Sequence, residues 1–246
     1  MTTAGVYFHG LPGGPAELDA LGPGSKLNAI DRMNTGGGSY EARLEAVAQA
    51  LEPGGPHRVV AFSLGAMTAL RLAAEYPDVV KELILIAPAG PLQLGDFLSD
   101  MAGRPVFEAA HRSGLAFKGL VLGQATAIRA MPQSFLESLF RGAPLHDRAL
   151  LVDPDIMDGL IMAWRSAILQ ARSAYRDELT AYVSDWREVL PRVKVPVSIH
   201  MGAADSWVPP AMVKALGATL GVTPEVTEHP GLGHYGTASK VLLEIR

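Results

Sequence analysis

The fold of this chain is decided by residues 59–66, which read Val-Val-Ala-Phe-Ser-Leu-Gly-Ala. The apolar run that contains their first half, residues 57–62, predicts a buried β-strand. The residues that follow, 64–76, have the apolar spacing of a helix and stop before Pro77. Ser63 therefore lies at a corner where a strand turns directly into a helix.

Two small residues flank this serine: Ala61 lies two positions before Ser63, and Gly65 lies two positions after it. A sharp turn requires small residues there, because it brings the strand and helix backbones close together. Such a turn holds the serine in a strained conformation and places the first amide N–H groups of the helix beside its hydroxyl group. A hydroxyl group in this position acts as a nucleophile once a neighbouring base removes its proton. The alternative interpretation is a serine that only caps an ordinary helix.

The N-terminal third of the chain alternates strand and helix patterns. Short apolar runs over residues 5–10, 27–33 and 82–87 predict strands, and residues 39–51 have the spacing of a helix. Near-continuous apolar strands that alternate with helices are typical of a parallel sheet covered on both faces. The pattern therefore predicts an α/β protein.

The middle of the chain, residues 91–190, shows only helical patterns. Asp153 and Pro154 form a helix start, and Ser134 with Glu137 has the spacing of a capping box. A structureless loop of this length is rare in a compact domain. We therefore expect an inserted helical subdomain that sits over the ends of the strands, where open α/β sheets bind ligands.

Strands return in the C-terminal part of the chain. Residues 195–202 and 225–228 predict strands, residues 210–220 predict the helix between them, and a final helix follows His234. We therefore expect about six strands in a mostly parallel sheet flanked by helices.

The 246 residues correspond to one or two domains, at roughly 150 residues per domain. The change of pattern suggests how they divide. We expect an α/β core of residues 1–90 and 191–246, and a helical lid or cap of residues 91–190.

Composition excludes several classes of protein. Hydrophobic residues make up 48% and charged residues 19%, so the chain is not intrinsically disordered. The net charge of −4 argues against nucleic-acid binding, and the absence of cysteine excludes disulfides and zinc–thiolate sites. No apolar run is long enough to span a membrane, and the N-terminus lacks the basic and apolar regions of a signal peptide. We therefore expect a cytoplasmic protein that acts on a small molecule, and the sequence carries no signal for an oligomeric state.

A glycine-rich stretch follows the first predicted strand: residues 9–14 read His-Gly-Leu-Pro-Gly-Gly. Together with the turn at Ser63 it resembles the α/β-hydrolase superfamily. The resemblance is nearest to members with a His-Gly-x-Pro-Gly loop, such as proline-iminopeptidase-like and lactonase-like hydrolases. Ala61 departs from the family pattern, which has glycine there. The first predicted strand corresponds to the family's third strand, so the resemblance implies the α/β-hydrolase fold with six strands in place of eight.

The resemblance also implies an oxyanion hole. In the family, one N–H group comes from the residue after the His-Gly pair and the other from the residue after the nucleophile. These positions are Leu11 and Leu64 here. His9 and Gly10 support the loop in this interpretation, and His9 is structural rather than a base.

The family's catalytic triad runs in the order serine, acid, histidine along the chain. Residues 201–209 resemble the family's Gly-x-x-Asp-x-x-Val-Pro stretch, which makes Asp205 the acid, and His234 follows the last predicted strand as the base. Ser63 is then the nucleophile. The imidazole removes the proton of the hydroxyl group, and the carboxylate orients the imidazole and stabilises its charged form.

Other assignments stay open for two of these roles. His229 is the second choice for the base, although it lies within the last strand pattern. Asp177 and Asp185 are alternative acids, because some family members take the acid from the other side of the inserted block.

These assignments imply a serine hydrolase that forms an acyl-enzyme with a small, moderately apolar ester, lactone or amide, and that uses no metal or other cofactor. A second hypothesis is an aminopeptidase similar to proline iminopeptidases, in which lid carboxylates bind the substrate amine. The carboxylates available for this role are Glu137, Asp153, Asp155 and Asp158. A third hypothesis is a lyase or ligand receptor on the same fold, without hydrolysis. Three arginines are interpreted as solvated, although each has the charge to anchor a substrate carboxylate: Arg112, Arg165 and Arg172.

Overall fold

The computed structural model describes residues 5–112 and 114–245. Its strands form one six-stranded sheet in the order β2-β1-β3-β4-β5-β6, and every pairing between the described strands is parallel. The strands are β1 (Val6–Phe8), β2 (Asn28–Ala29), β3 (His57–Phe62), β4 (Val80–Ile86), β5 (Val197–Gly202) and β6 (Glu225–His229). The predicted α/β class with about six strands is confirmed.

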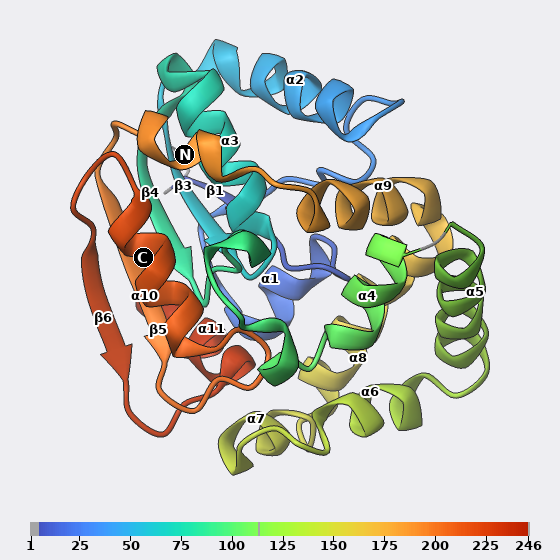
Figure 1. Cartoon of the computed structure of the whole chain (residues 1–246). Coiled ribbons are helices and arrows are strands. Elements are labelled where there is room, and N and C mark those ends of the chain that lie inside the picture. The colour runs from blue at the N-terminus through green and yellow to red at the C-terminus, as the bar shows by residue number, and fades with distance from the viewer. Residues whose placement is uncertain (1–4, 113, 246) are drawn as a thin grey trace.

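Helices cover both faces of the sheet (Figure 1). One face carries α1 (Ala16–Leu21) and α11 (His234–Glu244), which contact each other, and the opposite face carries α2 (Tyr40–Leu51), α3 (Gly65–Glu75) and α10 (Pro210–Thr219). Helix α1 is not predicted by any of the sequence patterns. None of the helices in the described part of the chain combines the length and the apolarity needed to cross a membrane.

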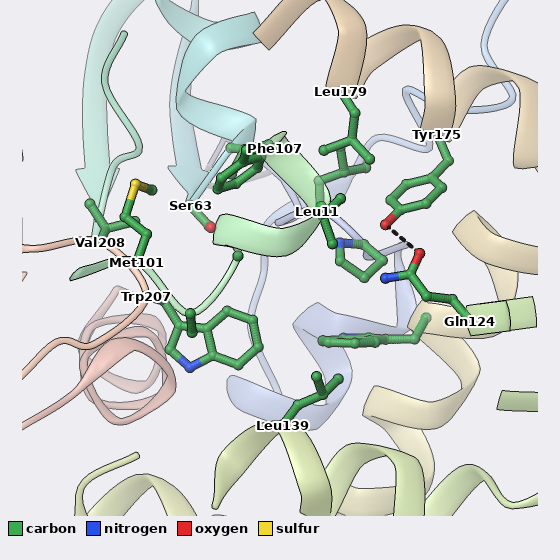
Figure 2. Close-up of a pocket in the computed structure, with 16 residues that line it drawn as sticks. Leu11, Ser63, Met101, Phe107, Gln124, Leu139, Tyr175, Leu179, Trp207 and Val208 are labelled. Atoms are coloured by element: carbon green, nitrogen blue, oxygen red, sulfur yellow. Dashed lines mark hydrogen bonds between the residues drawn. The ribbon is translucent and has the colours of Figure 1, made fainter. Parts of the chain in front are cut away.

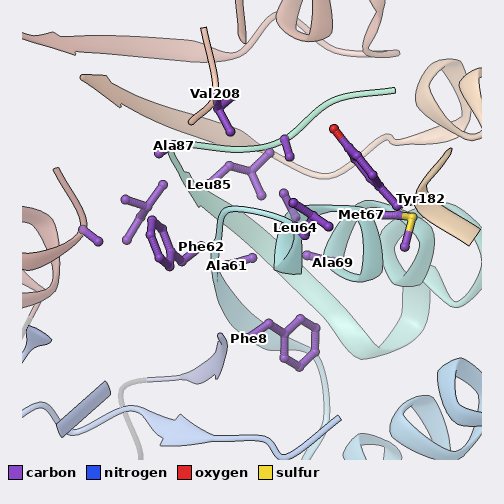
Figure 3. Close-up of a cluster of buried hydrophobic side chains, with 14 of the residues drawn as sticks. Phe8, Ala61, Phe62, Leu64, Met67, Ala69, Leu85, Ala87, Tyr182 and Val208 are labelled. Carbon is purple, nitrogen blue, oxygen red and sulfur yellow. The ribbon is translucent and has the colours of Figure 1, made fainter. Parts of the chain in front are cut away.

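Buried apolar side chains hold β1, β3 and β4 against α3 (Figure 3). Phe8, Met67 and Leu85 are each at most 1% exposed. Full burial of such a side chain contributes about 1.5–3 kcal/mol. Strands that are buried on both faces have continuous apolar sequences, which is why the sequence patterns predict them. The same core holds the ends of these strands in place.

The strand order reverses between β1 and β3. The chain moves outward from β1 to β2, returns across β1 to β3, and then continues in one direction to β6. Such a reversal leaves a crevice at the carboxyl ends of the strands, where α/β proteins bind their ligands. The glycine-rich stretch of residues 9–14 follows β1, and Ser63 follows β3, so both lie at this crevice.

Between β4 and β5, the described residues form helices and no strand; we call residues 92–192 the helical segment. Its elements are η3 (Leu92–Leu94), η4 (Leu98–Asp100), α4 (Arg104–Arg112), α5 (Gly114–Ala130), α6 (Pro132–Phe140), α7 (Leu145–Leu150), α8 (Pro154–Arg165), η5 (Ser166–Gln170), α9 (Arg172–Val183) and η6 (Arg187–Arg192). Two further short turns lie outside it, η1 (Glu52–Gly54) and η2 (Pro77–Val79). Helix α8 packs against α1, and α9 packs against α2 (Figure 1). The division into a core and a lid stays a prediction, and its residues 1–4, 113 and 246 lie outside the described residues.

Gly65, the first residue of α3, leaves no room for a side chain. A Cβ atom at this position would lie 2.6 Å from the carbonyl oxygen of His9 and 2.7 Å from that of Phe8. We expect Gly65→Ala to lower the free energy of unfolding by about 1–3 kcal/mol, because α3 must shift away from the end of β1. Urea unfolding followed by circular dichroism measures this change.

Gly119, within α5, offers a matched control. A Cβ atom there meets nothing within 4 Å. Gly119→Ala should therefore stabilise the protein by up to about 1 kcal/mol through helix propensity alone. Equal stability of Gly65→Ala and the wild type would contradict the close approach of α3 and β1.

Candidate active site

Ser63 occupies the turn between β3 and α3 in a left-handed backbone conformation, with φ = 55°. This region is strained for a serine, as the predicted sharp turn requires. The Ser63 N–H donates to the carbonyl oxygen of Ile86 at 3.0 Å, and the Ser63 carbonyl oxygen accepts from the N–H of Ala89 at 3.1 Å. The end of the neighbouring strand β4 and the residues after it therefore anchor the turn.

The structure brings Ser63, His234 and Asp205 together in one hydrogen-bonded chain. His234 Nε2 lies 2.9 Å from Ser63 Oγ, and His234 Nδ1 lies 2.7 Å from Asp205 Oδ2. The other carboxylate oxygen, Oδ1, accepts the N–H groups of Trp207 and Val208 at 2.8 and 2.9 Å. The carboxylate is thereby held so that Oδ2 accepts the Nδ1 proton. Nε2 is then free to accept the proton of the serine hydroxyl group.

Burial separates this hydrogen-bonded chain from water. The side chains of His234 and Asp205 are each 2% exposed. The ring of Phe62 lies 4.6 Å from the imidazole, centroid to centroid, and the ring of Trp207 lies 6.0 Å from it. In an environment of low dielectric constant, a carboxylate strongly stabilises a neighbouring imidazolium. The arrangement is therefore able to take a proton from a hydroxyl group and return it.

Leu11 and Leu64 line the same cavity as Ser63, and Leu64 directly follows Ser63 in the chain. Among the hydrogen bonds between described residues, neither the Leu11 N–H nor the Leu64 N–H has an acceptor. Leu64 directly precedes α3, and the N–H groups at a helix start have no partner within the helix. Two free N–H groups beside a nucleophile are the arrangement that stabilises an oxyanion.

A buried ion pair holds the glycine-rich loop from one side. Arg32 and Glu178 lie 2.8 Å apart, and their side chains are 2% and 1% exposed. The Arg32 guanidinium also donates to the carbonyl oxygens of His9 and Gly10. From the other side, Glu17 accepts the N–H of Gly10 at 2.8 Å. Tertiary contacts therefore hold both residues that were predicted to support the loop.

His9 is fully buried, and its Nδ1 lies 2.8 Å from the carbonyl oxygen of Gly10. Burial and the nearby Arg32 guanidinium lower the pKa of His9 well below its ordinary value. None of its hydrogen bonds among the described residues reaches Ser63. A neutral histidine that is bonded within the loop fits a structural role.

Glu17, on α1, is a buried carboxyl group that the sequence patterns do not single out. Its Oε1 accepts the hydroxyl of Tyr7 at 2.7 Å and the N–H of Gly10 at 2.8 Å, whereas Oε2 has no partner among the described residues. Burial raises the pKa of Glu17 from 4.5 to about 7, although both donors oppose the rise. This carboxyl group therefore changes its charge near neutral pH directly beneath the loop.

We expect Glu17→Gln to remove a component of the pH dependence of stability. The folded state raises the pKa of Glu17 from 4.5 to about 7, so protonation of the carboxyl group favours the folded state. This contribution to stability is complete below pH 4.5. This contribution, on the order of 3 kcal/mol, is lost as the pH rises through the folded-state value. Urea unfolding at a series of pH values should show the wild type losing stability relative to Glu17→Gln across this range.

Glu45 provides the control for this measurement, because its carboxyl group is exposed on α2. The difference between Glu45→Gln and the wild type should stay nearly constant over the same range. If Glu17→Gln and the wild type have parallel stability profiles, the raised pKa of Glu17 is wrong.

A cavity lies beside Ser63, between the carboxyl ends of the strands and the helical segment (Figure 2). Its wall is mostly apolar and includes Phe107, Leu139 and Leu179, and the lining residues that the structure describes include no acidic or basic side chain. The cavity volume is about 70 Å³. The site is therefore suited to a small, uncharged group.

The alternative base and acids lie elsewhere. His229 is on the edge strand β6, and its Nε2 lies 3.2 Å from Nδ1 of His200. Asp177 and Asp185 each pair with an arginine, and both are more than 40% exposed. None of these three side chains hydrogen-bonds to His234 among the described residues. The structure also shows no group of three or more histidine, aspartate or glutamate side chains placed to hold a metal ion within residues 5–112 and 114–245.

The charged residues considered for substrate binding lie away from the cavity. Four carboxylates are exposed, and none of them lines it: Glu137, Asp153, Asp155 and Asp158. The arginines are also engaged elsewhere: Arg112 pairs with Glu108, and Arg165 and Arg172 donate to backbone carbonyl groups. The aminopeptidase hypothesis therefore loses the carboxylates on which it depends.

Asp147, on α7, joins the helical segment to α11 and is not marked by any sequence pattern. Its two carboxylate oxygens accept the N–H groups of Tyr235 and Gly236, each at 3.0 Å. Burial raises the pKa of Asp147, and these two donors oppose the rise. A carboxylate at a helix N-terminus also complements the helix dipole. Asp147 therefore holds the first turn of the helix that begins with His234.

Comparison with known sequences shows a matching protein family and a related enzyme. The sequence profile of a family described as the alpha/beta hydrolase family matches residues 6–240. An esterase of Mycobacterium tuberculosis is 31% identical over 160 residues, which cover 59% of this chain and 52% of that esterase. The chain thus matches about half the length of this relative.

Solved structures share the fold. A thermophilic esterase from Thermogutta terrifontis has a TM-score of 0.68 at 18% identity, over 98% of this chain and 87% of that one. A bromoperoxidase from Bacillus anthracis has a TM-score of 0.66 at 17% identity, over 98% of this chain and 88% of that one. At these identities, the likeness shows a common architecture.

Proposed function

Because this chain belongs to the α/β-hydrolase family, we propose that it is a serine hydrolase in which Ser63 is the nucleophile. In this proposal His234 is the base, and Asp205 orients it. The observation that carries the proposal is the hydrogen-bonded chain from Asp205 Oδ2 through the imidazole to Ser63 Oγ, with distances of 2.7 and 2.9 Å. The strained turn at Ser63 and the free N–H groups beside it support the same conclusion.

The proposed reaction has two halves. Ser63 Oγ attacks the carbonyl carbon of the substrate while His234 Nε2 takes the hydroxyl proton, and the N–H groups of Leu11 and Leu64 bind the resulting oxyanion. The bond to the leaving group then breaks, the leaving group receives the proton from His234, and the acyl group stays on Ser63. Water attacks this acyl-enzyme with His234 again as base, which releases the acid and regenerates the serine.

The proposed substrate is a small, uncharged and moderately apolar ester, lactone or amide. The described lining of the cavity has no acidic or basic side chain, and burial of an unpaired charge against it would be strongly unfavourable. The relative from Mycobacterium tuberculosis is named an esterase, which favours the ester within this class. We also propose that residues 91–190 act as the lid, because residues of this block form one wall of the cavity.

Covalent labelling with a fluorophosphonate tests the proposal. Intact-mass measurement and peptide mapping should show one adduct, on Ser63, and Ser63→Ala should form none. No adduct under conditions that label a known serine hydrolase would contradict the proposal. An adduct without turnover of any ester, lactone or amide in a panel of short substrates would favour the lyase or receptor instead.

A further inference from the structure

One polar side chain in the cavity wall has no part in the proposed mechanism. Gln124, on α5, is half-buried and lines the cavity among apolar neighbours that include Leu139, Trp164 and Leu179. Ligand sites of this kind use a few placed polar groups to select and orient their ligands. The orientation of the Gln124 amide therefore bears on which substrates fit.

Tyr175, on α9, sets that orientation. Its hydroxyl donates to Gln124 Oε1 at 3.1 Å, the dashed line of Figure 2. Burial raises the pKa of Tyr175, so its hydroxyl keeps its proton and remains a donor. Because the amide oxygen is engaged, the amide nitrogen is the end that faces the cavity (Figure 2). The hydrogen bonds among the described residues include no acceptor for its two N–H groups.

The two indole groups in the wall do not duplicate this donor. Trp207 Nε1 is buried without a partner among the described residues, and Figure 2 shows it turned away from Ser63. The Trp164 side chain interacts with the Tyr235 hydroxyl group and lowers its pKa, against the rise that burial causes. Gln124 therefore offers the free side-chain N–H groups of this part of the cavity.

We propose that Gln124 determines substrate specificity by donating a hydrogen bond to an uncharged oxygen acceptor, such as a ketone, amide or ether oxygen, that the substrate carries away from the scissile carbonyl group. This inference rests on the proposed hydrolase function and narrows its substrate class. The acceptor is uncharged because the described lining offers no cation to pair with a carboxylate. The acceptor belongs either to the acyl group or to the leaving group of the substrate.

Two series of esters show whether the acceptor lies in the acyl group or in the leaving group of the substrate. In the first, para-nitrophenyl hexanoate is compared with derivatives that carry a ketone at the third, fourth or fifth carbon of the acyl chain. In the second, the ketone is placed in the alcohol chain of butyl hexanoate. At least one derivative should exceed its parent ester in kcat/KM by about tenfold, as one well-formed neutral hydrogen bond allows. The series that contains it identifies the part of the substrate that contacts Gln124.

Variants of Gln124 and Tyr175 test whether the preference for a ketone ester depends on the Gln124 amide. Gln124→Leu removes both N–H groups and should bring the ratio of ketone to parent ester down to about one. Gln124→Glu places an acceptor oxygen in a group of the same shape and should bring the ratio below one, whereas Tyr175→Phe frees the amide to rotate and should give an intermediate ratio. Each ratio is taken within one variant, so a general loss of activity cancels. Gln133→Leu, exposed on α6, is the matched control and should keep the wild-type ratio.

A preference that persists in Gln124→Leu, or that appears in neither series, overturns the proposal. Titration calorimetry on Ser63→Ala separates this outcome from failure of the hydrolase function. At least one ketone ester of the two series should bind Ser63→Ala about tenfold more tightly than its parent ester, and the additional Gln124→Leu change should abolish the difference. Such binding without a fluorophosphonate adduct on the wild type would refute the hydrolysis alone, and its absence would refute the role of Gln124.

Discussion

Replacement of His234 by alanine is expected to lower kcat for para-nitrophenyl hexanoate by about 10⁶-fold, and Ser63→Ala should lower it equally. The two side chains act as one unit, because Ser63 Oγ is a weak nucleophile until His234 Nε2, 2.9 Å away, takes its proton. The double variant should therefore be no slower than either single variant. Asp205→Asn should cost about 10⁴-fold, because an amide favours the tautomer with the proton on Nε2.

Control measurements show whether a variant loses activity through its chemistry or through its folding. His234 is 2% exposed, so its truncation leaves a cavity, and His234→Gln repeats the measurement with most of that volume filled. Thermal unfolding of each variant establishes that the protein remains folded. Losses that multiply in the double variant would show that Ser63 and His234 act independently, which contradicts the proposed triad. A Ser63→Ala protein that keeps more than about one thousandth of the wild-type kcat would also contradict the proposed triad.

The sheet could be predicted from the sequence because its inner strands are buried on both faces and their apolar runs are uninterrupted. Helix α1 could not, since it has only six residues, Ala16–Leu21, and no side-chain hydrogen bond caps its start. The predicted capping box of Ser134 and Glu137 is wrong: α6 begins at Pro132 and its N-cap is Met131, so Ser134 lies within the first turn of the helix. Proline is favoured in the first turn of a helix, and this preference outweighs the spacing of the two polar residues.

The candidate site also contains residues that could be predicted from the sequence and residues that could not. Ser63, Asp205 and His234 each follow the end of a strand, and topology brings the carboxyl ends of parallel strands to one edge of the sheet. The supporting residues have no such local signature. Asp147 binds a backbone group 88 positions along the chain, and Arg32 pairs with a side chain 146 positions away. These contacts depend on how the helical segment packs, so only the structure reveals them.

Arg32→Met is expected to lower the free energy of unfolding by about 3–5 kcal/mol, because it leaves the carboxylate of Glu178 buried and without its partner. The side chains of Arg32 and Glu178 are 2% and 1% exposed, so water does not replace the lost contact. Arg43 does not substitute for Arg32, since its guanidinium already donates to the carbonyl oxygens of Gly38 and Ala174. Urea unfolding of Arg32→Met measures the loss.

The double variant Arg32→Met/Glu178→Leu separates stability from activity. It removes both buried charges, so most of the lost stability should return, to within about 1–2 kcal/mol of the wild type. Activity should not return with it, because the carbonyl oxygens of His9 and Gly10 still lack the Arg32 guanidinium that holds the loop. A displacement of this loop by about 1 Å would misplace the Leu11 N–H, and a kcat loss on the order of 10²-fold is expected. If kcat recovers together with stability, the ion pair serves the fold alone and the loop holds its position without Arg32.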